Sequence, residues 1–301
     1  MNLNFLIFPK PKPTYSHDEK FGQLIYIPRD YRQWSITHPC ISSDKVGGLF
    51  GHKREVEAFG FYDCKCIPCL YFPCPQPSTK ILLYFHGNAE DVNLTQELMY
   101  TLQEELKVHI IAMEYEGYGV YKGNTNAENI LRDCELLFYY VINVLKYTPN
   151  NIIIFGRSIG SGPASHLASR YPIHSLILMS AFTSLRAVVK GLIGSLLQYA
   201  IAERFVNKAL MKKVNCPVFL IHGKKDGLIS HKQAEELYKE IKNAVLYLAE
   251  EMDHNSFDFK VDFVTPLMEF YTREKFSFEP KDEATGLLVL PMKVFNKPAK
   301  K

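Results

Sequence analysis

From about residue 80 onward, the chain alternates short apolar runs with longer amphipathic ones. The apolar runs cover residues 80–87, 108–115, 151–156, 175–180, 218–223 and 244–250. Because they are apolar throughout rather than at every second position, they are typical of strands buried on both faces. The segments between them, 94–106, 126–147, 162–170 and 233–243, have the spacing of helices. Strands alternating with helices predict an α/β fold with a mostly parallel central sheet and helices on both faces.

The region 21–79 has a different pattern, with proline, glycine and aromatic residues spread through short extended pieces. We expect these pieces to form antiparallel strands on the edge of the sheet. The pattern therefore predicts one domain over residues 21–272. Residues 1–20 form a separate N-terminal segment in this interpretation, and the proline-containing residues 273–301 form a tail.

Composition narrows the class of protein. The 301 residues are 47% hydrophobic and 22% charged, which is typical of a soluble globular protein. A formal net charge of +3, with no basic run interleaved with aromatics, disfavours nucleic-acid binding. The seven cysteines are an odd number in a long chain and do not suggest a disulfide framework. No apolar stretch has the length of a signal peptide or a membrane span, so we expect a cytoplasmic protein, with attachment to a membrane surface left open.

One motif carries candidate chemistry. Residues 151–163 read NIIIFGRSIGSGP and contain Gly-x-Ser-x-Gly directly after an apolar strand and before a helix of small residues. A nucleophile elbow requires this context, because its serine occupies a strained turn between a strand and a helix. Gly156 and Gly160 would leave room for the strand and the helix to approach each other. Ser158 is therefore the candidate nucleophile, and the alternative is an ordinary serine in a glycine-rich turn.

A serine nucleophile needs a base and a group that orients the base. Asp226 follows the strand at 218–223, and His254 follows the strand at 244–250. The order Ser158, Asp226, His254 is the order of such triads in folds of this type. Because the carboxyl ends of parallel strands share one edge of a sheet, the three side chains could converge there. We predict that Ser158 attacks, His254 is the base and Asp226 orients it.

Each of these residues has an alternative interpretation. Asp226 precedes a glycine and could be an ordinary turn residue. His254 could be a surface histidine, in which case His231 would be the rival base, although it follows Ser230 in what looks like a helix N-terminus. Asp253 is a rival acid, but adjacent side chains rarely face each other.

An oxyanion hole would need two backbone N–H groups near the serine. The residue after the nucleophile, Ile159, is expected to supply one of them at the start of its helix. Asn88, in the turn His86-Gly87-Asn88 after the first central strand, is expected to supply the other. We expect His86 to shape that turn rather than to perform acid–base chemistry.

Several motifs together resemble the alpha/beta-hydrolases, namely FHGNAEDV, MEYEGYGVYKG, IIIFGRSIGSGPASHLASRYP, CPVFLIHGKKDGLIS and MDHNSF. With FLIFPKPKPTY and PCLYFPCPQ, the chain most resembles the alpha/beta-hydrolase-domain-containing protein 17 family over residues 5–272. The segment 181–217 looks longer than the family's, and its place between the last strands predicts a small helical cap insertion. The resemblance implies removal of palmitate from protein cysteines without a metal or an organic cofactor. It implies an acylated protein or a lipid-like ester as substrate and peripheral membrane contact. The family attaches to membranes through an N-terminal cysteine cluster, but here no cysteine precedes Cys40.

Four cysteines, Cys64, Cys66, Cys69 and Cys74, crowd into one short segment. Their spacing lacks the paired knuckles of a zinc site, so we expect them to pack within an edge strand. Zinc binding and acylation of a cysteine are the alternatives.

Two further features are open to more than one interpretation. The insertion has an apolar helical stripe formed by Val189, Ile193, Leu196, Leu197, Ala200 and Ile201. This stripe could pack on the core or form a lid over an acyl chain or against a bilayer. One of Tyr115, Tyr118 and Tyr121 could line the active-site pocket.

Overall fold

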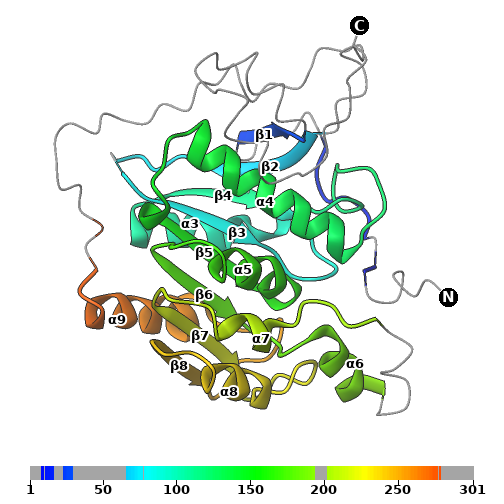
Figure 1. Cartoon of the computed structure of the whole chain (residues 1–301), viewed down its shortest axis with the longest axis vertical. Coiled ribbons are helices and arrows are strands. Elements are labelled where there is room, and N and C mark those ends of the chain that lie inside the picture. The colour runs from blue at the N-terminus through cyan, green and yellow to red at the C-terminus, as the bar shows by residue number, and fades with distance from the viewer. Residues whose placement is uncertain are drawn as a thin grey trace, which may run out of the picture.

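The computed structural model describes residues 8–9, 11–16, 23–29, 66–76, 78–193, 202–276 and 278. Its eight strands form one sheet in the order β1-β2-β4-β3-β5-β6-β7-β8 (Figure 1). The strands are β1 (Gln23–Pro28), β2 (Cys66–Phe72), β3 (Ile81–Phe85), β4 (His109–Met113), β5 (Ile152–Arg157), β6 (Ser175–Met179), β7 (Val218–Gly223) and β8 (Ala244–Ala249).

The strand directions agree with the sequence-based prediction. Strands β3 to β8 are parallel, whereas β1 pairs with β2 and β2 pairs with β4 in antiparallel register. The six parallel strands lie where the apolar runs occur, and β1 and β2 come from the region 21–79. The α/β architecture is therefore confirmed.

Seven α-helices in the described residues connect and cover the strands. They are α3 (Gln96–Leu106), α4 (Ala127–Asn143), α5 (Ser161–Ala168), α6 (Leu185–Ile193), α7 (Asn207–Met211), α8 (Lys232–Tyr238) and α9 (Thr265–Arg273). Short helical turns precede three of them: η2 (Val92–Thr95), η4 (Ser158–Gly160) and the π-helical η6 (Phe259–Val264). A further turn, η3 (Pro149–Asn151), leads into β5. The apolar pattern did not predict α9.

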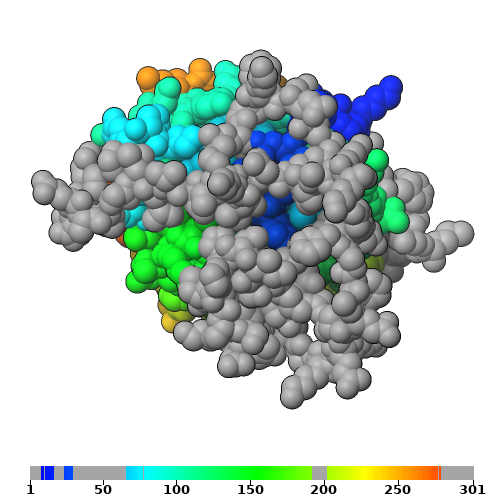
Figure 2. Space-filling view, turned by 90° about the horizontal axis from the view of Figure 1, so that it is seen from above, coloured from blue at the N-terminus to red at the C-terminus, as the bar shows by residue number. Residues whose placement is uncertain are grey.

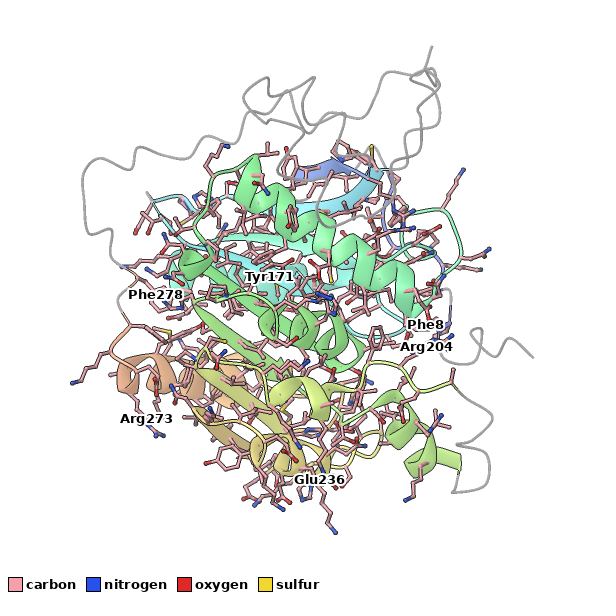
Figure 3. All side chains as sticks on the ribbon, viewed as in Figure 1. Phe8, Tyr171, Arg204, Glu236, Arg273 and Phe278 are labelled. Atoms are coloured by element: carbon pink, nitrogen blue, oxygen red, sulfur yellow. The ribbon has the colours of Figure 1, made fainter. Side chains whose placement is uncertain are left out.

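The core has two halves because consecutive strand residues point to opposite faces of the sheet. In β3, Ile81, Leu83 and Phe85 belong to the core that α4, α5, α7 and α8 cover. Leu82 and Tyr84 belong to the core that α3 and α9 cover. The side chains drawn in Figure 3 fill both layers. This two-sided burial explains why the central strands read as continuous apolar runs.

Strand β8 departs from that pattern. Its residues are half-buried except Ala249, although the sequence is apolar. The reason is its place at the end of the sheet, where only β7 pairs with it. The apolar pattern alone could not distinguish an edge strand from a central one.

The described part of the N-terminal segment packs against the domain. Thr14 donates its backbone N–H and its hydroxyl to Asp91, at 2.7 Å each. Tyr15 is buried, and its hydroxyl donates to Glu114 at 2.9 Å. Figure 2 views the molecule from the β1 end of the sheet, where the blue atoms of this segment and of β1 lie near the cyan atoms of β2.

The insertion at 181–217 contains α6 and α7. Val189 is buried in the core shared with α4 and α5. Leu196, Leu197, Ala200 and Ile201, which carry most of the predicted stripe, lie outside the described residues. The existence of a lid therefore stays a prediction.

The clustered cysteines lie on and after β2. Cys66 is half-buried and Cys69 is buried within the strand, and Cys74 is buried just beyond it. Cys64 lies outside the described residues. Within the described ranges, no cluster of three or more histidine, cysteine or acidic side chains is arranged to hold a metal ion. A search of the same ranges finds no helix with the length and apolar character needed to cross a bilayer.

Candidate active site

Ser158 occupies a sharp turn between β5 and α5. Its backbone has φ +51°, which is the left-handed region that residues with a Cβ rarely adopt. The side chain is buried, with 5% of the residue's surface exposed. A strained non-glycine residue at a strand-to-helix turn is the conformation of a nucleophile elbow.

Gly160 makes this turn possible because it lies against the end of β3. A Cβ at Gly160 would be 2.0 Å from the carbonyl oxygen of Phe85 and 2.8 Å from that of His86. The close approach brings the turn of Ser158 and Ile159 next to the turn that follows β3. The expectation that glycine leaves room for the strand and the helix to approach each other is confirmed at Gly156, where a Cβ would lie 2.4 Å from the carbonyl oxygen of Gly160 and 2.6 Å from the Cβ of Ala164.

Gly160→Ala is therefore expected to destabilise the fold by about 3 kcal/mol, since the Cβ would overlap backbone that cannot move aside. Gly227→Ala is the matched control, because a Cβ at Gly227 would meet no atom within 4 Å. Urea unfolding of the two variants checks this prediction. Equal free energies of unfolding for the two variants would contradict it.

The structure brings Ser158, His254 and Asp226 together. His254 Nε2 lies 3.1 Å from Ser158 Oγ, and His254 Nδ1 lies 2.7 Å from Asp226 Oδ2. All three residues are at least nine-tenths buried. The two distances allow the serine hydroxyl to donate to the imidazole while the imidazole donates to the carboxylate.

Asp226 combines the two roles that its sequence context suggested. Its Oδ1 accepts the backbone N–H groups of Leu228 at 2.9 Å and Ile229 at 2.8 Å, as in an ordinary aspartate turn. Its Oδ2 faces His254 and also lies 3.2 Å from Nε2 of His222. Burial acts to raise the pKa of Asp226, but the hydrogen bonds from His222, His254 and Ile229 outweigh it and hold the pKa below its ordinary value. Asp226 is therefore a fixed anion beside the imidazole.

The rival residues occupy other positions. His231 is the N-cap residue of α8, as the sequence suggested. Asp253 is exposed, and its carboxylate accepts the backbone N–H of Asn255. The hydrogen bonds to Ser158 and Asp226 come from His254.

The turn after β3 contains Asn88, one of the two predicted oxyanion donors. The preceding N–H group, that of Gly87, donates to Glu90 Oε1 at 2.5 Å. Two tyrosines hold this turn: Tyr118 donates its hydroxyl to Asn88 Oδ1 at 2.6 Å, and Tyr115 donates to the carbonyl of His86 at 2.9 Å. The third tyrosine of that stretch, Tyr121, donates to Asp133 instead.

Beneath this turn lies a buried ion pair. The ring of His86 donates from Nδ1 to the carbonyl of Gly87 at 2.8 Å, and its Nε2 lies 3.0 Å from Glu114 Oε1. Burial acts to lower the pKa of His86, but Glu114 outweighs it and the pKa is raised. Because both ring nitrogens face acceptors, His86 is an imidazolium that stabilises the turn, in line with the expectation that it shapes the turn.

The raised pKa of His86 predicts a pH dependence of stability. Its stabilising contribution is fully present below the unfolded histidine pKa of about 6.5 and is lost as the pH rises through the folded value. Between the unfolded and the folded pKa values we expect the free energy of unfolding to fall by up to about 1.4 kcal/mol per pH unit, and above the folded value this contribution is absent. Urea unfolding between pH 6 and 9 measures the slope, and Glu114→Gln should flatten it. His231→Ala should keep the wild-type slope, and identical slopes in all three proteins would count against the assignment.

Sequence reasoning missed four residues around the site. They are Glu90, Glu114, Arg157 and His222. Each contacts a predicted site residue or its turn through a side chain. Their positions in the sequence could have indicated them, because each lies within four residues of a predicted site residue or directly after β4.

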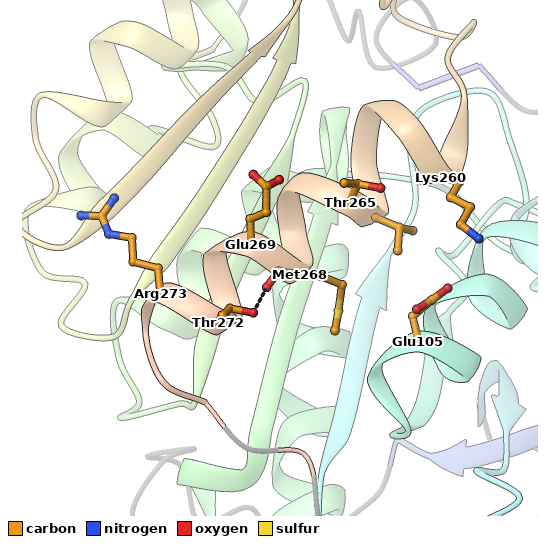
Figure 4. Close-up of a pocket in the computed structure, with 8 residues that line it drawn as sticks. Glu105, Lys260, Thr265, Met268, Glu269, Thr272 and Arg273 are labelled. Atoms are coloured by element: carbon orange, nitrogen blue, oxygen red, sulfur yellow. Dashed lines mark hydrogen bonds between the residues drawn. The ribbon is translucent and has the colours of Figure 1, made fainter.

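A hollow of about 540 Å³ lies between α3 and α9, away from these residues (Figure 4). It is lined by Glu105, Lys260, Val264, Thr265, Met268, Glu269, Thr272 and Arg273. None of the predicted site residues lines it.

A family model described as Hydrolase_4, serine aminopeptidase S33, matches residues 76–212. The alpha/beta hydrolase domain-containing protein 17C of Xenopus laevis is 30% identical over 280 residues, which cover 89% of this chain and 88% of that protein. The human protein 17C is 29% identical over 208 residues, covering 68% of this chain and 62% of that protein.

Solved structures show the same fold at low sequence identity. An esterase of Pyrococcus furiosus superposes with a TM-score of 0.57 at 16% identity, covering 70% of this chain and 89% of that one. Mouse alpha/beta hydrolase domain-containing protein 10 superposes with a TM-score of 0.53 at 15% identity, covering 74% of this chain and 100% of that one. The mostly parallel sheet, with a strand–turn–helix elbow in its middle, is that of an alpha/beta-hydrolase. Within that class, the chain belongs to the alpha/beta-hydrolase-domain-containing protein 17 family.

Proposed function

We propose that the protein is a serine hydrolase that cleaves an acyl ester or thioester through an acyl-enzyme. The observation that carries the proposal is the continuous hydrogen-bonded chain from Ser158 Oγ through the His254 ring to Asp226 Oδ2, with distances of 3.1 and 2.7 Å. Such a chain activates a serine that would otherwise be a weak nucleophile at neutral pH.

In the acylation step, Ser158 Oγ attacks the carbonyl carbon of the substrate while His254 Nε2 takes the hydroxyl proton. Asp226 holds the ring with Nε2 toward the serine and stabilises the imidazolium that forms. The tetrahedral intermediate then collapses, the bond between the carbonyl carbon and the sulfur or oxygen breaks, and His254 returns the proton to the leaving thiol or alcohol.

The negative oxygen of the intermediate would be held by the backbone N–H groups of Ile159 and Asn88. Ile159 directly follows the nucleophile at the start of its helix, where the helix dipole also favours negative charge. The N–H of Gly87 is donated to Glu90, so the proposal assigns the second donor to the next residue in the turn.

In deacylation, a water molecule replaces the leaving group. His254 takes a proton from the water as the water oxygen attacks the acyl carbon; the bond between that carbon and Ser158 Oγ then breaks, and His254 returns the proton to Ser158 as the acid is released. The proposal needs neither a metal ion nor an organic cofactor, since proton transfer and charge stabilisation come from the side chains and amides named above.

For the substrate we propose a long-chain acyl thioester on a protein cysteine. The support is that the chain belongs to the alpha/beta-hydrolase-domain-containing protein 17 family. The resemblance of the chain to that family implies removal of palmitate. A lipid or small-molecule carboxylester is the runner-up, because it would use the same triad and oxyanion donors. Peripheral attachment to a membrane, where such acylated proteins are found, belongs to the same proposal.

Two matched series of substrates test the proposal. The first contains peptides carrying acetyl, octanoyl or palmitoyl groups on one cysteine, and the second contains p-nitrophenyl esters of the same chain lengths. We expect kcat/KM to rise with chain length and to be highest for the palmitoyl thioester. Ser158→Ala gives the background rate for every substrate.

Preference for short esters would reject the depalmitoylase assignment and leave the serine-hydrolase mechanism intact. Cleavage of an aminoacyl p-nitroanilide in preference to all the esters would point to peptidase activity instead. A wild-type rate equal to that of Ser158→Ala on every substrate would favour a non-catalytic binding protein.

A further inference from the structure

Arg157 connects the two loops that flank Ser158. It is the last residue of β5, and its Nη1 lies 2.9 Å from both carboxylate oxygens of Glu90. Its Nη2 donates to the carbonyl oxygen of His254 at 2.8 Å and to Asn255 Oδ1 at 2.9 Å. One planar guanidinium therefore binds the loop after β3 with one nitrogen and the loop after β8 with the other.

Glu90 extends this connection to the oxyanion turn. The same Oε1 that Arg157 contacts also accepts the backbone N–H of Gly87, the residue before Asn88. A Cβ at Gly87 would lie 2.7 Å from Glu90 Oε1 and 3.1 Å from Arg157 Nη1, so the backbone is close-packed against both side chains. A movement of the guanidinium would therefore move the turn.

The guanidinium is held firmly enough to fix the distance between the two loops. Arg157 is 8% exposed, its charge is compensated by Glu90, and the ring of Phe257 lies 6.0 Å from its central carbon. Arginine stays charged at any physiological pH and presents its donors in a rigid plane, whereas lysine is a single point charge on a flexible stem. Only arginine can serve both loops in this arrangement.

We propose that Arg157 is a positioning residue that fixes the separation between the Asn88 amide and the His254 imidazole on either side of Ser158. This inference rests on the proposed serine-hydrolase function, because it assigns no chemistry to Arg157 itself. Misplacing either group by a fraction of an ångström reduces the stabilisation of the transition state more than it reduces substrate binding. Loss of the link should therefore appear in kcat rather than in KM.

Arg157→Lys tests the need for a planar donor. We expect kcat on a p-nitrophenyl ester to fall about 10- to 100-fold, with KM within about threefold of wild type. Arg170→Lys is the matched control: Arg170 also pairs with a carboxylate, that of Glu135, but it lies on the surface after α5. We expect its kcat to equal that of wild type. A kcat for Arg157→Lys within twofold of wild type would overturn the proposal.

Chemical rescue separates positioning from a general structural effect. Millimolar guanidinium chloride should restore kcat of Arg157→Ala at least about fivefold, whereas methylammonium chloride at the same ionic strength should not, because it lacks the planar fork. Equal responses to the two salts would overturn the proposal.

If the Arg157 variants fail to fold, the ends of the link can be changed instead. Glu90→Gln and Asn255→Ala lie on different loops, so without a connection their effects on kcat should simply multiply. We expect a combined effect at least threefold smaller than that product, since either change alone already loosens the link. Simple multiplication would overturn the proposal. Fluorophosphonate labelling of wild-type Ser158 is measured alongside, because its absence would instead reject the proposed function.

Discussion

Ser158→Ala is expected to reduce turnover by at least about 10⁴-fold and to abolish covalent labelling by a fluorophosphonate probe. The substitution removes only the Oγ atom that lies 3.1 Å from His254, and an alanine can occupy the same backbone conformation. Circular dichroism and urea unfolding should show a folded protein. Labelling is measured by mass spectrometry of the intact chain and of its peptides, so that the modified residue is identified directly.

Ser161→Ala is the control for this result, since Ser161 is a second buried serine nearby, at the start of α5. Its hydroxyl accepts a hydrogen bond from Asn207 at 3.0 Å, so its loss should reduce stability by about 1 kcal/mol while labelling continues. Labelling that persists in Ser158→Ala would show that Ser158 is not the nucleophile.

The second large effect is expected from His254→Ala. Without the imidazole, Ser158 has no group to accept its proton and the leaving group has no acid, so kcat should fall by about 10⁴-fold or more. His231→Ala should change kcat by less than about twofold, because His231 lies at the N-terminus of α8 and has no part in the proposed mechanism. Both variants are assayed on the same p-nitrophenyl ester at saturating concentration.

This pair of variants distinguishes the two histidines that the sequence offered as bases. The reverse result, with a large loss in His231→Ala and near-normal activity in His254→Ala, would show that the arrangement of His254 with Ser158 and Asp226 is not the one used in catalysis. Equal and small losses would reject acid–base catalysis by either histidine.

The fold was largely predictable because the two-sided burial of a parallel sheet leaves a direct mark on the sequence. The residues of β3, β5 and β7 are buried throughout, and these strands are apolar except at the carboxyl ends of β5 and β7, which read Gly-Arg and His-Gly. The exposure of β8 was not predictable, since it depends on the position of the strand in the sheet. The crossing that puts β4 between β2 and β3 also leaves no mark on local pattern.

The candidate site likewise has residues that the sequence could predict and residues that it could not. Ser158, Asp226 and His254 could be proposed because each follows a strand, and strand ends meet at one edge of the sheet. The residues that hold the surrounding loops could not be predicted, because side-chain pairs such as Arg157 with Glu90 depend on how distant loops fold back toward each other. His86 and Glu114 likewise follow neighbouring strands, but nothing in their local sequence pairs a ring nitrogen with a carboxylate.

The distribution of the site over the sheet has a consequence for the order in which the protein is made. The proposed oxyanion turn and the elbow follow β3 and β5, whereas the proposed acid and base follow β7 and β8, the last two strands in the described residues. The ribosome extends the chain from its N-terminus, and a domain folds as a unit. A nascent chain therefore carries Ser158 and the proposed oxyanion turn well before His254 is synthesised. Under the proposed mechanism, hydrolytic activity is expected only after β8 and the loop that carries His254 have joined the domain.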